Sequence, residues 1–239
     1  MNFGYILTLL IFCLLFGVGI YLMKYIRNFK LFNLIFLALV YIPYVSMCVF
    51  VYFTDTDLNR WNFLNTLPVA NVSPFMFSLM PILLILPKRI KEYVYLLISM
   101  LTMGMLLSTV FGCVGNALRN YKFHFHFTLD YLSHFALAAF GIFLIRSKQV
   151  KFNSKNCIIS GSTIFSIATI MMILNVIFDK SFFGLSLNGK HNIYNMVLTS
   201  NSYLSALIYY IGLGCVLLLG VAVCKLFNNR NMDISNESY

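Results

Sequence analysis

The residues best suited to chemistry in this 239-residue chain are two histidines that flank one aspartate at a spacing of four. His126, Asp130 and His134 share one face of a helix, because residues four apart lie one above the other. A carboxylate placed there can accept a ring N–H and orient either imidazole. Histidine titrates near neutral pH, which suits general acid–base chemistry at an ester. His134 lies deepest among apolar residues, so we interpret it as the catalytic candidate and Asp130 as its orienting partner.

The same residues do not predict a metal site. His126 and His134 are eight residues apart, a rise of about 12 Å along a helix. Zinc–nitrogen bonds measure only about 2 Å, so one ion takes an adjacent pair but hardly both ends. His124 and His126 also stand among aromatic residues and resemble an interfacial belt. We therefore expect neither a metal nor a cofactor.

Other polar side chains gather at the depth of His134 in the expected membrane segments. Polar groups in hydrocarbon are costly and normally face the bundle interior or a wet cavity. The sequence therefore predicts an outward-facing polar pocket in which Asn71, Asn116, His134 and Asn175 converge. The candidate substrate-binding residues of this pocket are Asn71, Ser73, Asn116, Asn175 and Asn195.

Long apolar segments must position these residues. Only 10% of the chain is charged and the mean hydropathy is +0.84, whereas soluble domains carry roughly 25% charged residues. A helix of about 20 apolar residues crosses a hydrocarbon core of roughly 30 Å. The sequence thus predicts an all-α membrane protein, a single seven-transmembrane-helix domain over residues 1–227 with a polar, disordered cytoplasmic tail at 228–239. The expected helices lie near 4–23, 31–53, 68–87, 93–115, 127–145, 157–178 and 203–224.

Basic residues between these helices predict the orientation of the chain. Twelve of the 17 Lys and Arg residues fall after the first, third and fifth helices or in the tail, and five fall on the other side. Positive residues remain cytoplasmic. We therefore expect the N-terminus outside and the C-terminus in the cytoplasm, in a cell membrane of the bacterial cytoplasmic type. The basic side also suits anionic lipid headgroups.

Two other classes of protein are excluded. The six cysteines lie in or beside the apolar segments without a C-x-x-C pair, so zinc-finger and disulfide frameworks fail on spacing. The net charge of +10 is mostly an orientation signal, and no folded polar surface carries a basic patch for nucleic acid. Membrane lipids are the expected partners, and no nucleic acid is expected.

The third apolar segment is unusual because three prolines interrupt it: Pro68, Pro74 and Pro81. Each proline removes a backbone hydrogen bond and bends a helix. The carbonyl groups freed in this way can line a cavity.

Short motifs between residues 67 and 202 carry a family resemblance. They are Leu67-Pro68-Val69-Ala70-Asn71-Val72, then Tyr131-Leu132-Ser133-His134, then Asn175 and the stretch Asn192 to Met196 before Ser202. Together they resemble the YwaF-type family of bacterial integral membrane proteins, which carries L-P-L-H-L-C, F-L-S-H and N-Y-M segments. That family is related to a eukaryotic membrane phospholipid acyltransferase that acts through the Cys and the later His. The resemblance covers the third to seventh helices and implies that His134 is the family histidine.

The chain departs from the family where a nucleophile is needed. Val72 stands where the motif has Cys, and Ala70 where it has His. Without that thiol, thioester-type covalent catalysis is not implied. Ser73 is adjacent, but one position along a helix turns about 100° away. Cys113 has a suitable depth on the next segment, so the nucleophile stays open.

Three functions follow as hypotheses. The first is lipid handling by a YwaF-like bundle, either divergent acyl transfer or lipid binding without catalysis. The second is a small transporter or permease subunit, although the chain shows no internal repeat of the kind common in secondary transporters. The third is a structural or partner-binding membrane subunit. A changed lipid profile, changed solute uptake, or neither would discriminate them.

Overall fold

The structure is a computed structural model that describes residues 3–26, 28–54, 67–68, 71–119, 122–150, 152–178, 182–184 and 202–228. Helices account for 89% of these residues and no strand occurs among them, which confirms the all-α prediction. The helices are α1 (Phe3–Leu22), η1 (Met23–Tyr25), α2 (Phe29–Thr54), α3 (Val72–Ile82), α4 (Lys88–Leu118), α5 (Phe125–Arg146), α6 (Ser154–Phe178), η3 (Phe182–Gly184) and α7 (Ser202–Asn228).

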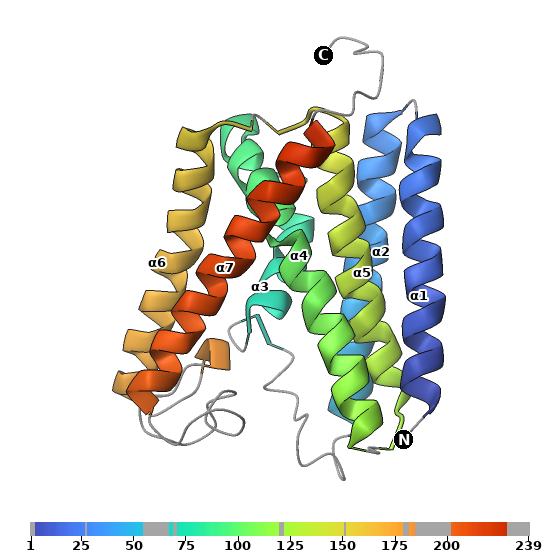
Figure 1. Ribbon diagram of the computed structural model, residues 1–239, viewed down its shortest axis with the longest axis vertical. Coiled ribbons are helices and arrows are strands. Elements are labelled where there is room, and N and C mark those ends of the chain that lie inside the picture. The colour runs from blue at the N-terminus through green and yellow to red at the C-terminus, as the bar shows by residue number, and fades with distance from the viewer. Residues whose placement is uncertain are drawn as a thin grey trace.

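Successive α-helices alternate in direction (Figure 1). The start of α1 and the end of α7 therefore lie at opposite ends of the bundle, as do the end of α2 and the start of α4. Among the described helices, six are long and apolar enough to cross a membrane, namely all of the α-helices except α3. The chain is thus a multi-pass membrane protein.

The third expected span is wrong in its length. We expected a helix over 68–87, but α3 covers only 11 residues, Val72–Ile82, and turns follow it. Proline explains both limits. Pro74 is tolerated in the first turn of a helix, where its missing N–H needs no partner. Pro81 lies in the last turn and Pro87 is the N-cap of α4. As a result, α3 begins well inside the bundle rather than at its edge (Figure 1).

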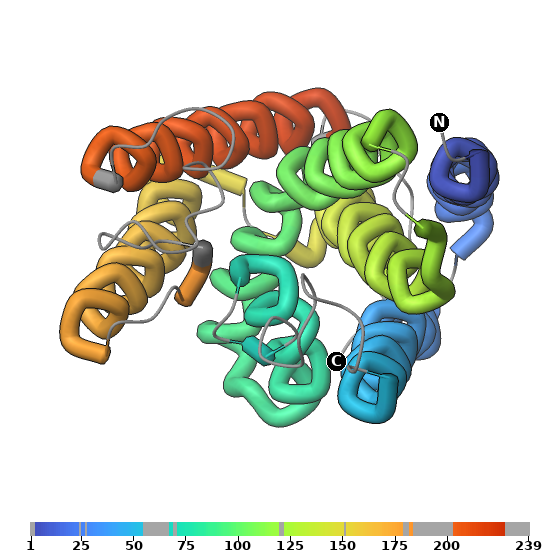
Figure 2. Tube along the Cα trace, turned by 90° about the horizontal axis from the view of Figure 1, so that it is seen from below, coloured from blue at the N-terminus to red at the C-terminus, as the bar shows by residue number. Residues whose placement is uncertain are grey.

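The α5 helix is the most enclosed element of the bundle. Fifteen of its residues are buried, and Figure 2 shows it between α1, α2 and α4. Phe143 of α5 packs on Phe36 of α2 with ring centroids 5.5 Å apart, and Phe140 lies beside them. Lipid is as apolar as these side chains, so close packing rather than escape from water holds the helices together. The candidate residues Asp130 and His134 therefore sit on a firmly packed helix.

A glycine fixes how α5 lies against α4. A Cβ atom on Gly141 would come within 3.2 Å of the Ile98 carbonyl oxygen and of the Ser99 Cα, closer than ordinary contact. The Ser99 hydroxyl also donates a hydrogen bond to the Gly141 carbonyl at 3.1 Å. Small residues allow helix backbones to approach closely in membranes. This contact sets the rotation of α5 and hence the direction in which His134 points.

Candidate active site

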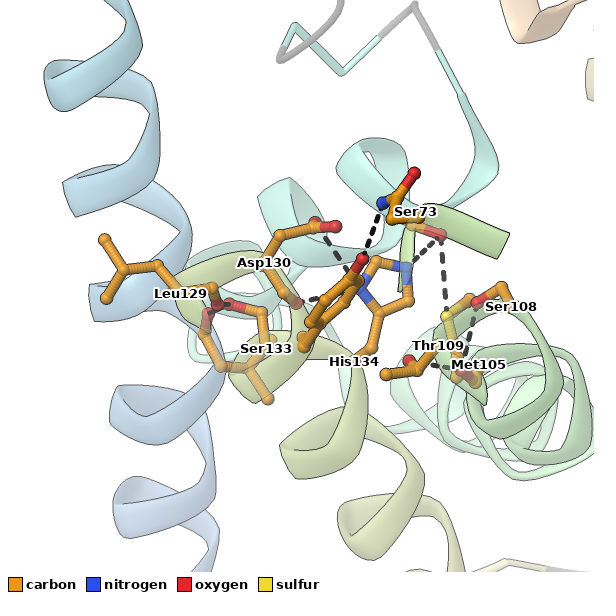
Figure 3. A network of polar contacts seen from close by, with 11 residues as sticks. Ser73, Met105, Ser108, Thr109, Leu129, Asp130, Ser133 and His134 are labelled. Carbon is orange, nitrogen blue, oxygen red and sulfur yellow. Dashed lines mark hydrogen bonds and ion pairs between the residues drawn. The ribbon is translucent and has the colours of Figure 1, made fainter. Parts of the chain in front are cut away.

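A hydrogen bond joins His134 of α5 to Ser73 of α3 inside the bundle. The distance from His134 Nε2 to Ser73 Oγ is 2.9 Å (Figure 3). His134 is 7% exposed, whereas Ser73 is half-buried, so Ser73 is the more accessible member of the pair. A serine hydroxyl bonded to an imidazole is the arrangement that activates serine as a nucleophile.

The partners of the other ring nitrogen decide where the imidazole proton lies. His134 Nδ1 is 2.8 Å from the backbone carbonyl oxygen of Asp130 and 3.4 Å from its carboxyl Oδ1. A carbonyl oxygen can only accept, so Nδ1 carries the hydrogen and donates it. The Nε2 atom of the neutral ring then presents its lone pair to the Ser73 hydroxyl. This is the tautomer that a general base for Ser73 requires.

The backbone carbonyl of Asp130, more than its carboxyl group, orients the ring. The 2.8 Å contact has hydrogen-bond length, whereas 3.4 Å to the carboxyl oxygen is beyond the usual range for an N–H donor. Asp130 is only 8% exposed, and its carboxyl faces the ring edge (Figure 3). The predicted pairing of Asp130 with His134 is present, and the carboxyl is placed to stabilise an imidazolium ion at close range.

The start of α3 brings Ser73 to the histidine. The helix begins at Val72 after Asn71, so Ser73 occupies its first turn. Residues four apart share a face, and Phe77 follows Ser73 by one turn. The Phe77 ring meets the His134 ring edge-on at 5.0 Å between centroids. One face of α3 therefore contacts the imidazole twice, through the hydrogen bond of Ser73 and through the ring of Phe77.

The first turn of α3 also offers backbone donors beside the hydroxyl. The side chain of Asn71 makes no cap hydrogen bond, and Pro74 has no N–H. The N–H groups of Val72 and Ser73 lie in this first turn, where a helix has no intrahelical acceptors for its N–H groups. Free N–H groups at a helix N-terminus attract negative charge. They are suitable donors for an oxyanion formed next to Ser73.

The α4 helix closes the far side of the serine. The Ser73 hydroxyl lies 3.7 Å from the sulfur of Met105, a weak acceptor compared with an imidazole nitrogen. The hydroxyls of Ser108 and Thr109 bond to the Met105 carbonyl at 2.9 Å each. These bonds are internal to α4, so they leave Ser73 with His134 as its strong partner.

The predicted pocket residues are divided among separate hydrogen-bond networks. Asn116 donates to the Tyr131 hydroxyl at 3.0 Å, whereas Asn175 bonds both backbone groups of Phe182 in η3. Asn71 is the N-cap of α3, and Asn195 lies outside the described residues. The structure joins His134 to Ser73 rather than to the asparagines. Convergence of Asn71, Asn116, His134 and Asn175 in one cavity stays a prediction.

Three other residues with reactive or polar side chains, Ser133, His126 and Cys113, lie apart from this site. Ser133 turns to α2 and donates to the Val40 carbonyl at 3.0 Å, which ties two helices together. His126 is fully buried and stacks on His124, with centroids 5.5 Å apart. Cys113 is buried in an apolar cluster that includes Tyr131. Among the residues that the structure describes, no group of three His, Cys, Asp or Glu side chains could hold a metal ion.

Sequence reasoning missed Ser73 as the partner of His134. The resemblance placed the nucleophile position at Val72, and a helix turns about 100° between neighbouring residues. The signal available in the sequence was the i, i+4 pair of Ser73 and Phe77, which puts a hydroxyl and an aromatic ring on one face.

Comparison with protein-family models, curated proteins and solved structures finds no match to this chain.

Proposed function

We propose that this protein is a membrane-embedded acyl-transfer enzyme in which Ser73 is the nucleophile and His134 the general base. The observation that carries the proposal is the 2.9 Å contact from Ser73 Oγ to the unprotonated nitrogen of His134. The N–H groups of Val72 and Ser73 in the first turn of α3 support it, because acyl transfer needs donors for an oxyanion.

The proposed reaction proceeds in two steps. Ser73 Oγ attacks the carbonyl carbon of an ester while its proton passes to His134 Nε2, and the backbone N–H groups stabilise the oxyanion. The ester C–O bond then breaks, and the departing alkoxide takes the proton from His134, which leaves an acyl group on Ser73. An acceptor hydroxyl gives its proton to His134 and attacks this acyl group. Ser73 leaves and recovers the proton.

The surroundings favour a lipid ester as the substrate. The pair lies within a bundle of apolar helices, so an acyl chain can approach through the membrane without crossing water. The acceptor is a lipid hydroxyl in a transferase or water in a hydrolase. The resemblance to the YwaF-type family agrees with a phospholipid substrate, with Ser73 in place of the thiol that Val72 lacks. The remaining predicted polar residues, including Asn195, would surround the headgroup.

The orientation of the bundle predicts the leaflet that supplies the substrate. We propose that the chain crosses the membrane seven times with its N-terminus outside. The third crossing would consist of α3 and the residues on either side of it. The start of α3 faces the end at which α1 begins (Figure 1). Since twelve of 17 basic residues lie at the other end, the site would open to the outer leaflet of a bacterial cytoplasmic membrane.

Reporter fusions test this topology. We expect the connections 54–66, 116–126 and 180–201 to face the exterior and Lys148 to face the cytoplasm, because basic residues resist translocation. A phosphatase that is active only outside should work when fused near Asn195, and a fluorescent protein that folds only inside should work at Lys148. Fluorescence from a fusion near Asn195 would reverse the orientation and the leaflet.

Lipid mass spectrometry tests the function itself. Membranes from cells expressing wild-type protein should differ in acyl-chain composition from membranes of cells expressing Ser73→Ala at equal abundance. Ser78→Ala is the matched control, because Ser78 lies on the same helix and its hydroxyl donates to the Phe75 carbonyl of that helix. Changed solute uptake with unchanged lipids would instead favour a transporter. No change in either would favour a structural or partner-binding subunit.

A further inference from the structure

A groove opens between α6 and α7, and its lining includes no residue of the helices α3 and α5 that carry the Ser73–His134 pair. The two helices diverge toward the end at which α6 begins and α7 finishes (Figure 1). The groove has a volume of about 470 Å³, within the range of roughly 300–1,000 Å³ typical of small-ligand sites. Met100 of α4 forms its floor, and its walls include Ile158, Phe165, Leu217 and Val221.

The shape of this groove suits one acyl chain. Its α6 wall runs from Ser154 to Phe165, a rise of about 16 Å. That is roughly half of a 30 Å hydrocarbon core, the depth of a single leaflet. Gly161 and Gly214 line it without side chains and so leave room. In a membrane, an apolar groove on the outside of the bundle is filled by lipid unless protein covers it.

The mouth of the groove carries positive charge. Lys225, in the last turn of α7, lines the same cavity as Ser154, the first residue of α6. The Asn153 side chain already caps the N–H of Asn156 at 2.9 Å, and the exposed Lys155 adds a second cation in this turn. A helix N-terminus beside a lysine attracts a phosphate group. The groove is therefore apolar along its length and positively charged at its mouth. A phospholipid in one leaflet has the matching arrangement, with an apolar acyl chain below a negatively charged phosphate.

We propose that this groove binds one anionic phospholipid, with an acyl chain between α6 and α7 and the phosphate at Lys225 and the start of α6. The site is separate from the proposed catalytic pair and does not depend on it. The basic residues that gather at this end favour an anionic headgroup over a zwitterionic one.

Native mass spectrometry of the detergent-solubilised full chain tests the proposal. Phosphatidylglycerol should bind with 1:1 stoichiometry and more tightly than phosphatidylcholine of the same chains. Lys225→Ala should weaken phosphatidylglycerol binding about fivefold, the effect of one lysine near an anionic surface. Ser162→Trp should abolish tight binding of both lipids, because exposed Ser162 lines the groove and an indole ring would fill it.

Lys88→Ala is the matched control. Lys88 is an exposed lysine at the same end of the bundle, at the start of α4, and it does not line the groove. It should leave phosphatidylglycerol binding unchanged. Equal losses in Lys225→Ala and Lys88→Ala, or no preference for phosphatidylglycerol, would overturn the proposal. So would a dimer that Ser162→Trp dissociates, because a second copy of the chain would then occupy the groove.

Discussion

A fluorophosphonate probe should label the wild-type protein covalently, and Ser73→Ala should lower the labelling rate by at least about 10³-fold. In the labelling reaction Ser73 Oγ attacks phosphorus, fluoride leaves, and His134 takes the hydroxyl proton. The rate depends on the 2.9 Å hydrogen bond, which a hydroxyl elsewhere on α3 lacks. Gel fluorescence after timed exposure of purified protein measures the rate directly.

Ser78→Ala should be labelled at the wild-type rate, since Ser78 bonds to its own helix. Ser73→Cys should react slowly with fluorophosphonate but should be alkylated by iodoacetamide, because a thiol beside a histidine ionises more readily. Labelling of Ser73→Ala at the wild-type rate would contradict the assignment of the nucleophile.

The two partners of the imidazole predict graded losses within the same assay. His134→Ala removes the general base and should lower the rate about 10²- to 10⁴-fold. Asp130→Asn keeps the backbone carbonyl that fixes the tautomer at 2.8 Å, so the loss should be smaller, about tenfold, from weaker stabilisation of the imidazolium. An equal loss in both variants would mean that the carboxyl group, rather than the carbonyl, orients the ring.

Gly220→Ala should destabilise the bundle more than the same change at Gly212 or Gly214, the other glycines of α7. The new Cβ would fall on the Met100 carbonyl of α4, and the Met100 Cα lies only 2.8 Å from its position. Backbone atoms cannot move aside as a flexible side chain can, so α7 must shift away from α4. Overpacking of this kind costs about 2 kcal/mol, which corresponds to a melting temperature lower by about 4–8 °C.

Gly212→Ala on the same helix is the control, because no atom of another described helix lies within 4 Å of its added Cβ. Alanine favours a helix over glycine by roughly 0.5–1 kcal/mol, so this variant should melt at or above the wild-type temperature. Thermal melting in detergent, followed by size-exclusion chromatography, measures both. Equal melting temperatures for Gly220→Ala and wild type would show that α4 and α7 do not meet at this glycine.

The amino-acid sequence determined those features that depend on neighbours along the chain. Hydropathy summed over about 20 residues is a local property, so the six long helices were predictable to within a few residues. The pairing of Asp130 with His134 was predictable for the same reason, because positions four apart must share a face of a helix. The length of α3 was not, because three prolines signal a bend without showing which one ends the helix.

Only the tertiary structure decided which hydroxyl meets His134. Ser73 and His134 are 61 residues apart, and their contact depends on where α3 begins and how it is rotated against α5. Those quantities follow from packing between helices, such as Phe77 on His134 and Gly141 on Ser99. The same packing placed Asn116 against Tyr131 and Asn175 against η3. The sequence shows which residues lie at the same depth in the membrane. Which of them touch depends on the rotation of each helix about its axis, and that rotation is set by close packing between helices.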